Sequence, residues 1–142
     1  MRTVRQLLEG KAPGVYAIGP DAPVIDAIRL MAEKRIGALL VMDAGALAGI
    51  VSERDYARKV VLQGRASHDT PVRDIMTADV VSVGLDDTVE RCMGLVTDRR
   101  IRHLPVLEGG HVVGVVSIGD LVKAVIEDQQ LELDQLQRYI AS

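Results

Sequence analysis

The sequence contains no Phe and no Trp, and its 3 Tyr are its only aromatic residues. Hydrophobic residues still make up 48% of the chain, most of them Val, Ile, Leu and Ala, so the core must be aliphatic and rich in the β-branched side chains that favour strands. The 142 residues suffice for one compact domain or two very small ones. A half of this chain would be marginal alone, so we expect two halves that pack together.

The chain has a single cysteine, Cys92, which excludes an intramolecular disulfide and disfavours a thiolate metal site. Because Cys92 lies within a helical apolar pattern, we expect a buried structural thiol and not a reactive one. No apolar run approaches the length of a membrane span, and the N-terminus lacks the apolar stretch of a signal peptide. We therefore expect a cytoplasmic protein with no membrane partner.

Neither sign of charge is in large excess, because 17 Lys and Arg stand against 20 Asp and Glu, well mixed along the chain. Nucleic-acid surfaces need clustered Lys and Arg, so the composition disfavours a nucleic-acid partner. The sequence also lacks an activated-nucleophile arrangement, an HExxH metal pair and a Walker-type glycine-rich loop. We expect a protein that is not an enzyme and requires no cofactor.

One phrase occurs twice: GIVSERD begins at Gly49, and GVVSIGD begins at Gly114. The same offset aligns residues 15–55 with residues 80–120 without a gap. Two copies are too few for a solenoid, which usually needs at least three. We interpret the chain as an internal duplication in which each copy covers the apolar face of the other.

Each copy predicts an extended segment, a helix, two strands joined by a glycine turn, and a second helix. The extended segments and strands are expected at 15–18, 36–43 and 47–52, and again at 80–83, 101–108 and 112–117. Asp55 and Asp120 are expected to open the second helices, the first of which ends at a Gly64 cap.

Three further segments surround the copies. Thr3 followed by Gln6 predicts a capping box at the start of a short helix, and Thr70-Pro71 predicts a second short helix. Residues 64–69 are polar and are interpreted as a linker. The last helix is expected to reach about Tyr139, with a C-terminal apolar stripe that packs either on the rest of the chain or on a second subunit.

The repeated Ser-x-x-Asp permits two interpretations. Ser or Asp can simply cap the helix that follows. Alternatively, the helix N-terminus and the Ser hydroxyl hold a phosphate, while the Asp carboxylate accepts hydrogen bonds from the two hydroxyls of a ribose. In the second interpretation, Gly49 and Gly114 leave room for close backbone approach.

The chain resembles a tandem pair of cystathionine-β-synthase (CBS) domains from about Thr3 to Glu127. The resemblance rests on "GVYAIGPDAPVIDAIRLMAEKRIGALLVMDAGALAGIVSERDY" and "IMTADVVSVGLDDTVERCMGLVTDRRIRHLPVLEGGHVVGVVSIGDL". It implies an α/β (α+β) fold of two β-α-β-β-α repeats packed sheet to sheet with pseudo-twofold symmetry. The implied boundaries are 3–66 and 71–130 for the two CBS domains and 131–142 for a C-terminal helix extension.

The resemblance also implies a non-enzymatic regulatory module that binds AMP, ADP, ATP, NAD(H) or S-adenosylmethionine in two clefts and signals energy or redox state. The first cleft would use Ser52, Arg54, Asp55, Thr77, Val80, Val81, Ile101, Arg102, His103 and Pro105. The second would use Ser117, Asp120, Val15, Tyr16, Ala17, Ile36, Gly37 and Ala38.

The first cleft is the stronger candidate, because Arg102 and His103 stand where this family places phosphate ligands and Arg suits that geometry. Gly37 and Ala38 hold those positions in the second cleft, so Asp55→Ala should weaken binding more than Asp120→Ala. Arg102 and His103 also have a structural interpretation as surface residues, and Tyr16 either stacks on an adenine or covers an apolar edge. The resemblance further implies a homodimer that acts on an unknown downstream protein, and the alternative function is a dimeric interaction scaffold with vestigial clefts.

Overall fold

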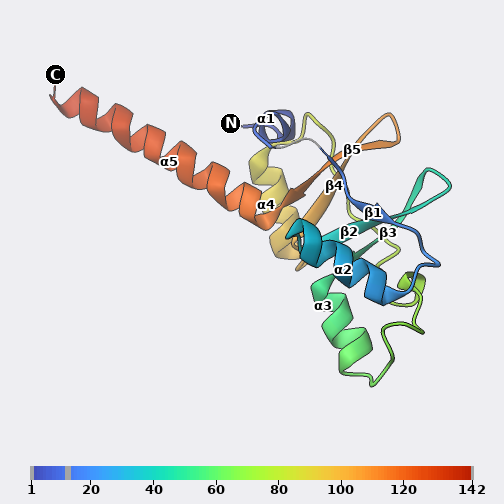
Figure 1. Ribbon diagram of the computed structural model, residues 1–142. Helices are drawn as coiled ribbons and strands as arrows, with labels where there is room; N and C mark the ends of the chain where they lie inside the picture. The colour runs from blue at the N-terminus through green and yellow to red at the C-terminus, as the bar shows by residue number, and fades with distance from the viewer. Residues whose placement is uncertain (1, 12–13, 142) are drawn as a thin grey trace. The chain divides into compact units, whose positions relative to one another are not determined.

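The computed structural model of this protein describes residues 2–11 and 14–141, and its fold is mixed α+β with two small sheets, as expected (Figure 1). The chain forms two compact units. The middle unit contains residues 14–81, and the N/C unit combines residues 2–11 with residues 82–141. The compact units therefore divide the chain differently from the sequence repeats. The predicted domain boundaries and the predicted packing of the two sheets stay predictions.

The middle unit holds the first β-α-β-β-α repeat. Its elements are β1 (Ala17–Ile18), α2 (Val24–Lys34), β2 (Ala38–Asp43), β3 (Ala46–Ser52) and α3 (Glu53–Tyr56), which continues as the π-helical turn η1 (Ala57–Val61). β2 lies between a parallel β1 and an antiparallel β3. The hairpin turn has positive φ at Ala44 and Gly45, which fits the expected glycine turn.

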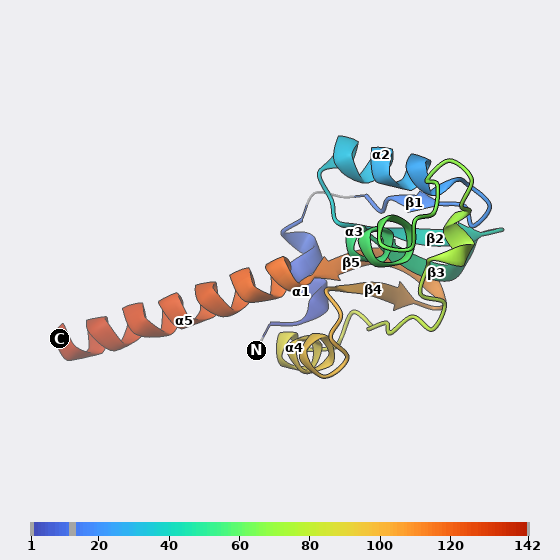
Figure 2. The same cartoon turned by 90° about the horizontal axis from the view of Figure 1, so that it is seen from below.

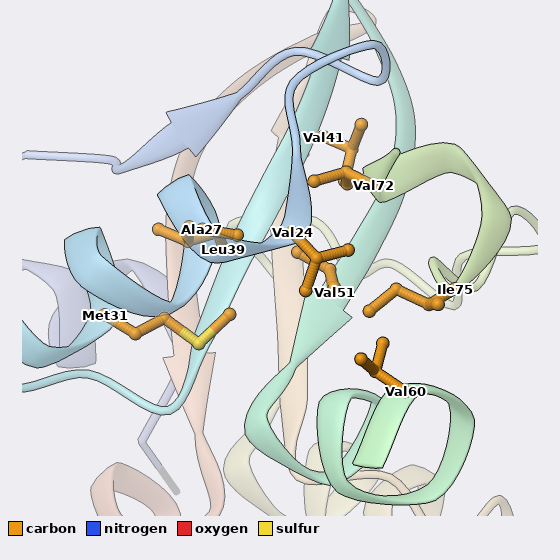
Figure 3. Packing of buried hydrophobic residues seen from close by; sticks show 9 residues of the cluster. All are labelled: Val24, Ala27, Met31, Leu39, Val41, Val51, Val60, Val72 and Ile75. Atoms are coloured by element: carbon orange, nitrogen blue, oxygen red, sulfur yellow. The ribbon is translucent and has the colours of Figure 1, made fainter. Parts of the chain in front are cut away.

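Nine aliphatic residues form the core of the middle unit (Figure 3). α2 contributes Val24, Ala27 and Met31, whose spacing of three to four places them on one helix face. Val72 and Ile75, both fully buried, come from the short 3₁₀ helix η2 (Val72–Asp74) and the residue after it. The segment after the first repeat therefore completes the core of that repeat.

Residues 64–69, the expected linker, are hydrogen-bonded within the middle unit. Gly64, at φ 67°, donates to the Val61 carbonyl, and Arg65 donates to the Val60 carbonyl, so Gly64 ends the helix as expected. The Ser67 carbonyl accepts a hydrogen bond from the Ile25 N–H at the start of α2. These polar residues satisfy backbone groups at helix ends, and their role as a linker between the two repeats stays a prediction.

The N/C unit holds the second repeat and the N-terminal helix. Its elements are α1 (Val4–Glu9), α4 (Val89–Asp98), the antiparallel pair β4 (His103–Glu108) and β5 (His111–Ser117), and α5 (Ile118–Ala141). The Thr3–Gln6 capping box is present at the start of α1. The Val4 and Arg5 N–H groups donate to the carbonyls of Asp87 and Leu85, so the N-terminal arm, residues 2–11, is bonded to the second repeat.

Two further predictions concern the second repeat. The expected extended segment 80–83 forms no strand, and only Val83 makes a bridge, parallel to Val106. Cys92 is buried as predicted, and burial raises the pKa of its thiol, with the Asp87 carboxylate adding to the rise. The buried thiol is therefore held in its neutral form.

Candidate functional site

Ser-x-x-Asp forms the same reciprocal cap in both repeats. The Ser52 N–H donates to Asp55 Oδ2 at 2.9 Å, and the Asp55 N–H donates to Ser52 Oγ at 3.1 Å. Ser117 and Asp120 repeat this arrangement at 2.8 and 3.2 Å. The structural interpretation is therefore confirmed for both copies, and it fixes each carboxylate at the N-terminus of a helix.

Each of these carboxylates also holds a lysine ammonium group. Lys11 Nζ donates to Asp120 Oδ2 at 2.7 Å and to the Val115 carbonyl at 2.8 Å. In the middle unit, Lys59 Nζ lies 3.3 Å from Asp55 Oδ1 and donates to the Ile75 carbonyl. Sequence reasoning missed both lysines. The i, i+4 spacing of Asp55 and Lys59 was a usable signal, whereas Lys11 lies 109 residues from Asp120 and had none.

Three basic residues lie beside the Ser117–Asp120 cap. His103 pairs with Ser117 across the β4–β5 ladder, and the Arg102 carbonyl accepts the Ile118 N–H at 2.8 Å. Lys11 reaches the same cap from the N-terminal arm. Arg102 is exposed and His103 is half-buried. We call Lys11, Arg102, His103, Ser117 and Asp120 the α5 cluster.

The corresponding place in the middle unit is less basic. Ala38 pairs with Ser52 across the β2–β3 ladder, and the Gly37 carbonyl accepts the Glu53 N–H at 3.0 Å. Gly37 and Ala38 therefore stand where the N/C unit has Arg102 and His103. The strand supplies no charged side chain there, and the cations near Ser52–Asp55 come from the following helix.

The electrostatics of the α5 cluster suit an anionic ligand. Burial acts to raise the pKa of the Asp120 carboxyl, but the hydrogen bonds from Lys11 and Ser117 outweigh it and hold that pKa below its usual value. Burial and the neighbouring charges of Lys11 and Arg102 lower the pKa of His103, against a smaller opposing effect of Asp120. Asp120 is therefore ionised at neutral pH, and His103 is neutral until it gains an anion as a partner.

Because they have no side chain, the two glycines of the repeated phrase allow neighbouring parts of the chain to pack closely against them. A Cβ at Gly49 would lie 2.7 Å from the Thr77 carbonyl oxygen, because Thr77 bridges to Ile50 through two backbone hydrogen bonds. A Cβ at Gly114 would meet the end of the Leu8 side chain at 2.8 Å. Close backbone approach was predicted correctly at Gly49, but the approaching group is the chain itself.

The other candidate residues are distributed as follows. Tyr16 is half-exposed, and the Lys34 ammonium lies 5.4 Å from the centroid of its ring. Thr77 and Arg54 are exposed, while Pro105 is buried within β4. The middle unit contains Val15, Tyr16, Ala17, Ile36, Gly37, Ala38, Ser52, Arg54, Asp55, Thr77, Val80 and Val81, and the N/C unit contains Ile101, Arg102, His103, Pro105, Ser117 and Asp120.

Metal-binding clusters and membrane-spanning helices are both absent from residues 2–11 and 14–141. This part of the chain holds no group of three or more His, Cys, Asp or Glu side chains arranged to bind a metal ion. None of the helices described there is long and apolar enough to cross a membrane.

Comparison with protein families identifies the class. The CBS-domain family model matches residues 11–62 and 72–127, so the chain belongs to the CBS-domain family and carries two such domains. Among curated proteins, the mitochondrial CBS domain-containing protein CBSX3 of Arabidopsis thaliana is 46% identical over 125 residues. That alignment covers 84% of this chain and 61% of CBSX3, so this chain corresponds to about three fifths of the relative.

Solved structures agree with this assignment. A proposed signal-transduction protein with CBS domains from Burkholderia ambifaria is 55% identical with a TM-score of 0.88, covering 90% of this chain and 96% of the other. The CBS domain pair of protein MJ0100 is 23% identical with a TM-score of 0.80, covering 90% and 98%, and shares the fold. Proteins of this kind are regulatory or signal-transduction modules.

Proposed function

We propose that this CBS pair binds an adenosine-containing nucleotide and regulates a partner protein without catalysing a reaction. The α5 cluster carries this proposal, because it joins an ionised carboxylate, a helix N-terminus and three basic residues. The MJ0100 pair was crystallised with 5-methylthioadenosine and S-adenosyl-L-methionine, so the shared fold is compatible with adenosine compounds. We also propose a cytoplasmic location.

The chemistry of the cluster assigns a separate role to each group. The Asp120 carboxylate accepts two hydrogen bonds from the vicinal hydroxyls of a ribose, once Lys11 gives up its place on that carboxylate. Lys11, Arg102 and His103 then surround a phosphate at the positive N-terminal end of α5. The Ser52–Asp55 cap offers the same carboxylate with fewer cations, and we propose it as a second site.

Calorimetric titration with AMP, ADP, ATP, NAD, NADH and S-adenosylmethionine tests the proposal. At least one compound should bind and raise the melting temperature by mass action. Chromatography of the bound nucleotide after prolonged incubation should recover it unchanged. Absence of binding by all six compounds would overturn the proposal, and turnover of the bound nucleotide would overturn its non-enzymatic part.

Affinity for a phosphate-bearing ligand should rise as the pH falls through the region of 6.5, the ordinary pKa of histidine. In the free protein burial and nearby cations keep the pKa of His103 below that value, and a bound phosphate should raise it. Binding then takes up a proton, so acidification favours the complex.

NAD is the best ligand for this measurement if it binds, because its pyrophosphate does not titrate in this range. His103→Gln should flatten the dependence while retaining a polar side chain. Equal pH profiles for the two proteins would show that His103 does not face the phosphate.

A further inference from the structure

α5 carries an apolar seam that the described chain leaves uncovered. The exposed fractions are 42% for Val122, 59% for Ile126, 52% for Leu133, 54% for Leu136 and 73% for Ile140. In Figures 1 and 2 the C-terminal half of α5 extends beyond α4, β4 and β5 of its own unit. Helices in proteins gain most of their stability from packing one face against a neighbour, so an unpacked half of α5 would be only weakly stable as a helix.

The seam has heptad spacing. Val122, Ile126, Gln129, Leu133, Leu136 and Ile140 are separated by four, three, four, three and four residues. This is the a/d repeat by which two helices pack knobs into holes. Ile126, Leu133 and Ile140 take a positions, and Val122, Gln129 and Leu136 take d positions. Ile at a with Leu at d favours two strands, and the seam has this choice at Ile126, Ile140 and Leu136. We call these six residues the α5 seam.

A different face of α5 packs on its own unit. Leu121 and Ala124 are fully buried, and α5 packs against α4. Arg2 binds Glu127 and Asp128 at 2.9 and 3.0 Å. Because these residues lie off the heptad positions, the N-terminal arm and α4 hold one face of the helix and leave the α5 seam open.

The distribution of charge on α5 allows a second, identical helix to pack against the seam. Glu127, Asp128 and Asp134 take b and c positions, which point away from a two-stranded seam. Glu132 flanks the seam at a g position, and in a parallel pair it faces the neutral Gln137 of the second copy. A second α5 therefore meets little like-charge repulsion.

Gln129 indicates the orientation of the pair. In a parallel, in-register dimer Gln129 meets its own equivalent, and the two amides can hydrogen-bond. In an antiparallel pair a d residue faces an a residue, so Gln129 would lie against Ile or Leu with its amide unsatisfied. A single polar layer of this kind sets register at some loss of stability.

We propose that the α5 seam binds the α5 seam of a second copy of this chain in a parallel, in-register, two-stranded coiled coil. Since the seam is shorter than the three to four heptads typical of stable coiled coils, we expect a dimer that dissociates on dilution. The proposal is independent of the nucleotide site, because no member of the α5 cluster belongs to the seam.

Sedimentation equilibrium of the full chain and of Leu136→Glu tests the seam. The substitution places a charge in the seam, and it should raise the dimer dissociation constant at least tenfold. Leu131→Glu is the matched control, because Leu131 is 57% exposed on the same helix but takes an f position. Circular dichroism should show that both variants fold. A dimer unaffected by Leu136→Glu, equal weakening by the two variants, or a monomeric parent chain would overturn the proposal.

Orientation is tested by Leu136→Cys under mild oxidation. In a parallel pair the two introduced thiols face one another and should form an intermolecular disulfide, whereas the buried Cys92 of the parent chain should not. A dimer that forms no such disulfide would overturn the parallel, in-register arrangement.

Discussion

Gly49→Ala is expected to lower the free energy of unfolding by about 2–3 kcal/mol, while the equivalent Gly114→Ala should cost about 1 kcal/mol or less. The difference follows from what each new Cβ would meet. At Gly49 it would lie 2.7 Å from the Thr77 carbonyl oxygen, which the Ile50 N–H holds in place. At Gly114 it would meet the end of the Leu8 side chain, which can change rotamer.

Urea unfolding of the three proteins measures this difference, provided that the slope of the transition stays constant. The two variants are matched controls, because they make the same change at equivalent positions of the repeat. If both variants lost the same free energy of unfolding, the Thr77 backbone would move away from a new Cβ as readily as the Leu8 side chain does. The backbone bridge between Thr77 and Ile50 would then not be rigid.

Asp120→Ala is expected to weaken nucleotide binding tenfold or more. The carboxylate would otherwise accept charge-assisted hydrogen bonds from the ribose, each worth about 1.5–3 kcal/mol, and about 1.4 kcal/mol is tenfold in affinity. Arg102→Ala should weaken the same binding event, because Arg102 and Asp120 belong to one cluster. Asp55→Ala should weaken a different event. If two nucleotides bind, calorimetric titration measures the two binding events separately.

The sequence paired Arg102 and His103 with Ser52–Asp55, so the experiment has a definite contrary outcome. If Arg102→Ala and Asp55→Ala weaken one event and leave a second intact, the sequence-based pairing holds and the α5 cluster is not one site. Thr88→Ala controls for lost capping, because Thr88 caps α4 by accepting the Arg91 N–H. It should cost stability, typically about 1 kcal/mol, and leave affinity unchanged.

Local patterns predicted most of the elements. The Thr3–Gln6 capping box, the Gly64 cap that ends the α3–η1 helix, and the β-α-β-β-α order all depend on residues within a few positions of one another. The duplication reinforced them, since each copy supports the interpretation of the other. The resemblance to the family rested on this order and spacing. The family model confirmed the family, and the solved structures confirmed the α+β fold.

The remaining features depend on contacts between distant residues. Lys11 reaches Asp120 across 109 positions, and no periodicity or cap indicates that pair. Val80–Val83 was expected to mirror Val15–Ile18, and only Val83 does so, because it bridges Val106 as Ile18 pairs with Val41. A duplicated sequence predicts equal copies, and it contains no local signal that Asp120 pairs with Lys11 where Asp55 pairs with Lys59.

The partition of the chain has a consequence for any attempt to divide it. Residues 14–81 form one uninterrupted stretch and contain all nine residues of their own apolar cluster. The other unit is built from two stretches of chain, one before and one after residues 14–81. A gene cut at the boundary of the sequence repeats would strip η2 from one fragment and the N-terminal helix from the other. The excised stretch 14–81 is therefore the sensible fragment for asking whether one half can fold by itself.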